Sequence, residues 1–122
     1  MIDLRFRPIE KAIAAPKGGA KKAPFEASFR RVLDDLEREL GYLKATDIVI
    51  EAALELREIR NDGWPYSNAR PRTPGIRLSF KSKHGALSYE CATYDHWEWN
   101  LQAIGLTLER VTTHLTHQGE AP

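Results

Sequence analysis

Residues 76–91, IRLSFKSKHGALSYEC, decide how this chain folds. Apolar and polar residues alternate over residues 76–81 and again over residues 87–92, which is the period of a β-strand with one buried face. The polar corner Lys83-His84-Gly85 separates the two runs. We therefore predict a β-hairpin that buries one of its two faces.

Four further segments have a clear hydrophobic period. Residues 48–56 alternate between apolar and more polar positions and predict a strand, and residues 2–7 predict a short edge strand that ends at Pro8. Apolar side chains at steps of three and four predict an amphipathic helix over residues 25–43 and a second helix over residues 97–115. Every predicted element therefore has one apolar side to bury.

Burying these apolar sides together requires two layers. We predict an α+β fold, a two-layer sandwich in which both helices pack on one face of a three- to four-stranded antiparallel sheet. A chain of this length supports one core, so residues 1–122 are expected to form a single domain. Gly and Pro predict a flexible basic linker at residues 14–24, residues 58–75 form a long loop, and the tail at residues 117–122 is expected to fray.

Composition excludes several classes of protein. The 122 residues include 18 Lys and Arg against 17 Asp and Glu, and this balance lacks the basic excess typical of nucleic-acid-binding proteins. No apolar run approaches the roughly 18 residues that a membrane span needs, and the first residues lack the apolar block of a secretory signal. We therefore expect a cytoplasmic protein with no membrane contact.

Charge is distributed along the chain in blocks of opposite sign. Residues 1–31 carry eight basic and three acidic residues, and residues 63–89 carry five basic and no acidic ones. Residues 32–62 carry four basic and nine acidic residues, and residues 90–122 carry one and five. Such blocks either neutralise one another in the fold or offer separate patches to partners, and we favour neutralisation.

No pattern in the sequence indicates a catalytic or metal site. Cys91 is the single cysteine and lies on the apolar side of its strand, where a thiol is usually inert. The nearby His84 and His96 are explained as surface residues, and His114 and His117 have a ligand spacing without a third partner. We therefore expect a non-enzymatic protein without a cofactor or metal.

The long loop carries the best candidates for contact with a partner. Trp, Tyr and Arg are the side chains enriched at binding hot spots, and this loop has Trp64, Tyr66, Arg70 and Arg72. We predict that these four side chains are the contacts of a protein-interaction module. The competing interpretation is that Trp64 packs on the core and the two arginines are solvated loop residues.

Nucleic-acid binding is the alternative function. Cations interleaved with aromatic rings are typical of surfaces that bind single strands. Residues 64–83 combine the aromatic side chains of Trp64 and Tyr66 with five cations and no acid; the cations are Arg70, Arg72, Arg77, Lys81 and Lys83. Under this hypothesis the loop and the hairpin together contact the phosphates and bases.

Three stretches of the chain resemble a known family. They are IDLRFRPIEK at residues 2–11, IRNDGWP at 59–65 followed by NARP at 68–71, and FKSKHGALSYECATYDHWEWNLQAIGLTLE at 80–109. Together they resemble the N-terminal region of J-domain-containing, DnaJ-like proteins encoded by bacteriophages and prophages. This chain has no His-Pro-Asp motif of a J domain, so no co-chaperone activity carries over. The resemblance implies a phage or prophage setting, with a host or phage protein as partner and the chain acting as an adaptor or as an inhibitor of a host complex.

Overall fold

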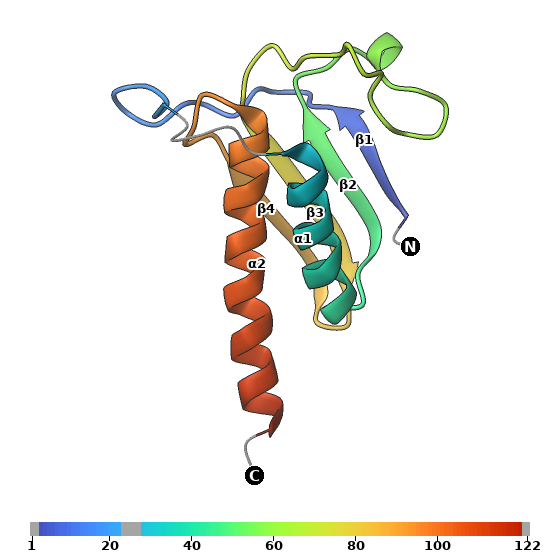
Figure 1. Cartoon of the computed structure of the whole chain (residues 1–122), viewed down its shortest axis with the longest axis vertical. Helices are drawn as coiled ribbons and strands as arrows, with labels where there is room; N and C mark the ends of the chain where they lie inside the picture. Colours follow the sequence, from blue (N-terminus) through green and yellow to red (C-terminus); the bar gives the residue numbers. More distant parts are fainter. Residues whose placement is uncertain (1–2, 23–27, 121–122) are drawn as a thin grey trace.

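The computed structural model describes residues 3–22 and 28–120, with residues 114–120 described by their backbone alone. It has an α+β fold made of a four-stranded sheet and two helices (Figure 1). The strands are β1 (Leu4–Pro8), β2 (Thr46–Ala52), β3 (Ile76–Ser82) and β4 (Gly85–Cys91), and the helices are α1 (Phe29–Tyr42) and α2 (Trp97–Glu120). A short 3₁₀-helix, η1 (Leu56–Glu58), follows β2.

The sheet is mixed, with the strand order β1-β2-β3-β4. β2 pairs with β3, and β3 with β4, in the predicted antiparallel manner, but β1 runs parallel to β2. The prediction of a wholly antiparallel sheet is therefore wrong at this edge. The reason is that α1 lies in the connection between β1 and β2 and brings the chain back along the sheet, so β2 enters in the same direction as β1.

The hairpin predicted at residues 76–91 is confirmed. β3 and β4 pair in one continuous register, from Ile76 opposite Cys91 to Ser82 opposite Gly85. Lys83 and His84 form the turn between the two strands.

β2 is shorter than the alternating pattern predicts. The strand ends at Ala52, and residues 56–58 turn into η1 instead of continuing it. Leu54 is still buried, but Leu56, which the alternation places on the same inward row, is 75% exposed. The segment EAALELRE at residues 51–58 is rich in residues that favour helices, and this local preference prevails after the last paired strand residue.

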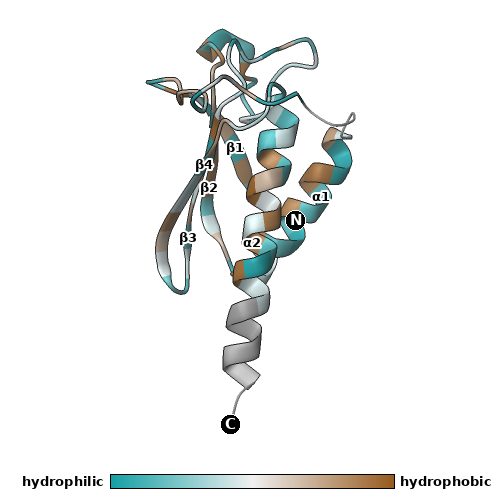
Figure 2. Ribbon diagram, turned by 90° about the vertical axis from the view of Figure 1, so that its left-hand side faces the viewer, coloured by the Kyte–Doolittle hydropathy of each residue, from teal (hydrophilic) through white to brown (hydrophobic). Residues whose placement is uncertain are grey.

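The hydrophobic core lies between the sheet and the helices. Figure 2 shows α1 and α2 on the same side of the sheet. The core is made of the inward side chains of β1, β2 and β3 and of the apolar stripes of both helices; it includes Leu4, Phe6, Leu36, Leu40, Ile48, Ile50, Ile76, Leu78, Phe80, Leu101 and Leu108. The other side of the sheet, called here the open face, carries exposed or half-buried side chains: Arg5, Arg7, Val49, Glu51, Arg77, Ser79, Ser88 and Glu90.

The segment predicted as a basic linker contains no helix or strand in its described part, residues 14–22, but it is attached to the fold at one point. The backbone N–H of Lys21 donates to the carbonyl of Thr93 (2.7 Å), and the N–H of Asp95 donates to the carbonyl of Lys21 (2.9 Å). Residues 23–24 of the predicted linker lie outside the described residues. Lys21 therefore lies beside the segment that leads into α2.

Asn100, which is completely buried, holds the start of α2 in place. Its Oδ1 accepts the backbone N–H of Tyr94 (2.9 Å), and its Nδ2 donates to the carbonyl of Pro74 (2.7 Å). The helix continues to Glu120, into the tail at 117–122 where we expected fraying; residues 121–122 lie outside the described part of the chain. Neither described helix has the combination of length and apolar character that crossing a membrane requires.

Candidate functional site

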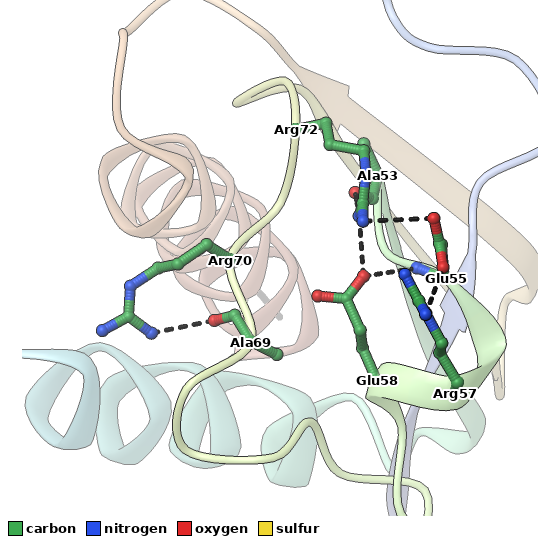
Figure 3. Close-up of polar contacts among 7 residues, drawn as sticks. All are labelled: Ala53, Glu55, Arg57, Glu58, Ala69, Arg70 and Arg72. Carbon is green, nitrogen blue, oxygen red and sulfur yellow. Dashed lines mark hydrogen bonds and ion pairs between the residues drawn. The ribbon is translucent and has the colours of Figure 1, made fainter.

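Arg72 clamps the long loop to the end of β2. We define the loop cluster as residues 53–75, which include η1. Arg72 Nη1 lies 2.6 Å from Glu58 Oε1, and Arg72 Nη2 lies 3.2 Å from Glu55 Oε1 (Figure 3). The backbone N–H of Arg72 also donates to the carbonyl of Ala53 (3.0 Å). Arg72 therefore joins the two ends of the loop cluster.

We call Arg72, Glu55 and Glu58 the clamp. The contacts within the clamp shift the pKa values of Glu58 and Arg72. The backbone N–H of Glu55 donates to Glu58 Oε1 (2.9 Å), and this bond together with the Arg72 guanidinium holds the pKa of the Glu58 carboxyl below its ordinary value. Conversely, the hydrogen bond to Glu58 raises the pKa of Arg72. Both groups of the ion pair are therefore charged at neutral pH.

A second ion pair shapes the loop cluster next to β1. Arg60 Nη2 lies 2.7 Å from Asp62 Oδ2, and the backbone N–H of Trp64 donates to Asp62 Oδ1 (3.0 Å). These two contacts, Arg60 first, lower the pKa of Asp62. The turn that they hold presents the carbonyl of Gly63 to the backbone N–H of Phe6 at 2.6 Å. The loop cluster therefore contacts the outer edge of β1 at Arg5 and Phe6.

The four predicted contact residues fall into different environments. Trp64 is half-buried, packs against the core, and has its ring centroid 5.6 Å from that of Phe6. Arg72 belongs to the clamp. Tyr66 is 50% exposed, and Arg70 donates to the backbone carbonyls of Ser67 (3.1 Å) and Ala69 (2.8 Å). Figure 3 shows the Arg70 guanidinium pointing away from the clamp, so Tyr66 and Arg70 are the two that the fold leaves available to a partner.

Two further residues of the loop cluster are exposed, and the sequence pattern did not predict them as contact residues. Leu56 is 75% exposed, and the side chain of Arg57, which pairs with Glu55, is 79% exposed. The predicted strand over residues 48–56 placed Leu56 in the core, and the chain leaves that strand at Ala52. The signal that could have found these residues is the helix-favouring composition of residues 51–58.

The cations of the nucleic-acid hypothesis are largely paired with carboxylates. Arg77 lies 3.1 Å from Glu90 and 3.6 Å from Glu51, and Lys81 Nζ lies 3.4 Å from Asp47 Oδ2. Arg72 has the two partners given above. Within the described residues, Arg70 bonds to backbone carbonyls, and Lys83 is exposed in the hairpin turn with no ion pair. Three of the five cations in the basic block therefore pair with carboxylates of the acidic blocks on either side of it, which agrees in part with the favoured interpretation of the charge pattern.

The residues considered for catalysis lie apart. Cys91 is half-buried at one end of β4, where its Sγ contacts Asn100 Oδ1 (3.3 Å), whereas His84 is exposed in the turn at the other end. Six residues of strand separate them by roughly 20 Å. Among the residues whose side chains are described, no three His, Cys, Asp or Glu are grouped so that they could hold a metal ion. The side chains of His114 and His117 are outside that set.

Comparison with known proteins assigns no family to this chain. No model of a protein family matches the sequence, and no curated protein matches it. What the chain does must therefore be inferred from its own surfaces, of which the exposed part of the loop cluster is the strongest candidate.

Proposed function

We propose that this chain is a non-enzymatic protein-interaction module whose contact surface is the exposed part of the loop cluster. The observation that carries the proposal is the exposure of Leu56 (75%) and Tyr66 (50%) in one short region of the chain. The two residues belong to the same structural unit, because the backbone N–H of Tyr66 donates to the carbonyl of Glu58 in η1 (2.9 Å). Large apolar side chains left in water on an ordered loop are typical of sites that become buried in a complex.

The ion pairs of the loop cluster support this function energetically. Association costs less free energy when the contacting loop is already ordered. Arg72 and Asp62 order the two ends of the segment that carries Tyr66. Arg57, which pairs with Glu55, and Arg70, which donates to backbone carbonyls, add two exposed cations to the loop cluster that can meet a partner's acidic groups. Tyr and Arg are among the side chains enriched at hot spots, and the exposed Leu56 adds apolar area to the same loop cluster.

The partner in this proposal is a host or phage protein. The resemblance to phage J-domain-containing proteins supports that setting, and the absence of the His-Pro-Asp motif directs the proposal toward an adaptor or an inhibitor of a host complex rather than a co-chaperone. This part of the proposal depends on resemblance alone.

The test compares two variants that remove exposed apolar side chains at different places. The first combines Leu56→Ser with Tyr66→Ser, and the control is Tyr42→Ser on α1, a tyrosine that is 64% exposed outside the loop cluster. Each purified chain is immobilised and exposed to a bacterial lysate with and without nuclease treatment, and the retained proteins are identified by mass spectrometry.

We expect one or more proteins that the unaltered chain and Tyr42→Ser retain and that the double variant loses, with no effect of nuclease. Because these side chains are exposed, all three chains should melt within a few degrees of one another. Retention that disappears after nuclease treatment would instead support nucleic-acid binding, and equal retention by all three chains would contradict the proposed surface.

A further inference from the structure

The outer edge of β4 is open. β4 is the last strand of the sheet, and among residues 3–22 and 28–120 no strand pairs with its outer side. In an antiparallel ladder, alternate residues direct their N–H and C=O groups away from the partner strand, so this edge offers a row of unpaired backbone donors and acceptors. β4 contains no proline, and its register with β3 has no bulge that would obstruct another strand.

The apolar side of β4 is also incompletely covered. Leu4 and Phe6, the inward side chains of the opposite edge strand β1, are each 3% exposed. The corresponding inward side chains of β4, Leu87, Tyr89 and Cys91, remain half-buried although α2 packs against this strand. A further strand beside β4 would cover them in the way that Trp64 covers Phe6.

On the open face, positively and negatively charged side chains alternate from β1 to the outer edge strand β4. Arg7, Glu51, Arg77 and Glu90 lie opposite one another on four successive strands, so that positive and negative side chains alternate across the sheet. Ion pairs join Arg77 to both of its neighbours in this charged row. The row ends at Glu90, whose side chain is 54% exposed. A cation in the next strand would continue the alternation, and oppositely charged pairs across strands are favourable.

We propose that the outer edge of β4 binds an extended segment of a partner protein as a fifth strand, with Lys or Arg opposite Glu90. Apolar residues on either side of that cation lie opposite Tyr89 and Cys91, a third apolar residue lies opposite Leu87, and a small polar residue lies opposite Ser88. The backbone hydrogen bonds supply affinity, and the alternating side chains select the sequence. This site lies at the opposite end of the sheet from β1 and the loop cluster that covers it, and it does not depend on the function proposed above.

A second copy of the chain fits this edge less well than such a segment. The sequence of β4, GALSYEC, contains one acid and no cation. Pairing β4 with β4 of another copy would therefore place no cation opposite Glu90 within the strand. The charged row favours a basic partner segment instead.

The test uses a blocked, fluorescein-labelled heptapeptide, Thr-Val-Lys-Val-Ser-Val-Thr, titrated with the full chain and followed by fluorescence anisotropy. In the antiparallel direction its Lys faces Glu90, its Ser faces Ser88, and its valines face the apolar side. A second peptide has Glu in place of Lys, and a third has N-methyl groups on the alternate residues whose N–H groups would face β4. The protein variants are Glu90→Lys and, as a control with the same change of charge, Glu10→Lys at an exposed position outside the sheet.

We expect saturable binding of the Lys peptide by the unaltered chain and by Glu10→Lys. Glu90→Lys should weaken this binding by about tenfold and should bind the Glu peptide better than the unaltered chain does, because the exchange restores opposite charges. The N-methylated peptide should not bind, since it cannot form the backbone bonds. The variant with Leu56→Ser and Tyr66→Ser should bind the Lys peptide normally, which separates this site from the loop cluster.

Three results would overturn the proposal: no binding of the Lys peptide, equal binding of the N-methylated peptide, or equal loss of binding in Glu10→Lys and Glu90→Lys. Sedimentation that shows a dimer abolished by Glu90→Lys would also overturn it, because a second copy would then occupy the edge. Amide chemical shifts should change most along residues 85–91 when the Lys peptide binds, and unchanged shifts there would likewise contradict the site.

Discussion

β1 and β4 are both edge strands of one sheet, but they differ in what lies beside them and in how far their inward side chains are buried. At β1 the loop cluster bonds Gly63 to Phe6 and packs Trp64 on its ring, and the inward side chains of β1 are almost fully buried. At β4 no described strand covers the edge, and the inward side chains remain half-buried. The difference teaches that burial of an edge strand depends on what lies beside it and not on its own sequence alone.

The largest loss of stability is expected from removing the ring of Phe6, on which Trp64 of the loop cluster packs. Phe6→Ala deletes a side chain that is 3% exposed and lies between the rings of Trp64 and Trp97, so it should lower the free energy of unfolding by about 3–5 kcal/mol. Tyr89→Ala, the matched change on half-buried β4, should cost about 1–2 kcal/mol. Urea unfolding measures both, and equal losses would mean that the two edges are equally buried.

The second prediction concerns two glycines with positive φ, one at each edge. A Cβ at Gly63 (φ +88°) would lie 2.7 Å from the Cβ of Arg5, whereas a Cβ at Gly85 (φ +104°) would meet nothing within 4 Å. Both substitutions by alanine incur the cost of a left-handed backbone, about 1 kcal/mol, but Gly63→Ala also forces the loop cluster away from β1. We expect Gly63→Ala to lower the melting temperature by several degrees more than Gly85→Ala; an equal effect would show that the contact with β1 is loose.

The third prediction tests whether Arg72 holds the loop cluster in place. Arg72→Ala removes both ion pairs of the clamp, and the amide protons of Tyr66 and Ala69, which bond within the loop cluster, should exchange with solvent severalfold faster. Amide protons of β3 should be unaffected. Arg31→Ala, at an exposed position on α1, is the control and should leave all of these rates unchanged. Hydrogen exchange followed by NMR provides the measurement.

The smallest effect on the stability of the folded chain is expected from lowering the pH. The lowered pKa values of Glu58 and Asp62 mean that both carboxylates stabilise the folded chain above their unfolded pKa values, near 4, and that this contribution is lost as the pH falls through the folded values. Carboxyl titration by NMR should show both groups ionising below their ordinary pKa, with Glu58 returning toward it in Arg72→Ala. Exchange of the Tyr66 amide should accelerate at low pH relative to that of β4; titration of Glu58 at its ordinary value would contradict the clamp.

Much of the fold follows from local pattern. The alternation over residues 76–91 predicts the hairpin because both strands and their turn are adjacent in sequence. The helical spacing predicts α1 and α2 because each stripe is buried against one sheet. The direction of β1 was missed, although a strand, a helix and a strand in succession is the usual arrangement of a parallel pair. The end of β2 was missed because alternation and helix preference conflict at residues 51–58.

The candidate site was predicted less well, for a reason of distance along the chain. Tyr66 and Arg70 were found by residue type, but the role of Arg72 depends on Glu55 and Glu58, which lie 17 and 14 residues away. No local spacing indicates such a pairing. The exposure of Leu56 depends in turn on where β2 stops, so an error in the strand became an error in the site.

The parallel pairing of β1 has a consequence for synthesis of the chain. β1 is translated before its partner strand at residues 46–52 and before Gly63, whose carbonyl accepts the backbone N–H of Phe6. At roughly 5–20 residues per second, about 3–11 s pass between translation of Phe6 and translation of Gly63. Leu4 and Phe6 therefore lack their partner strand until residues 46–52 have been made, and they lack the contact with the loop cluster until Gly63 has been made.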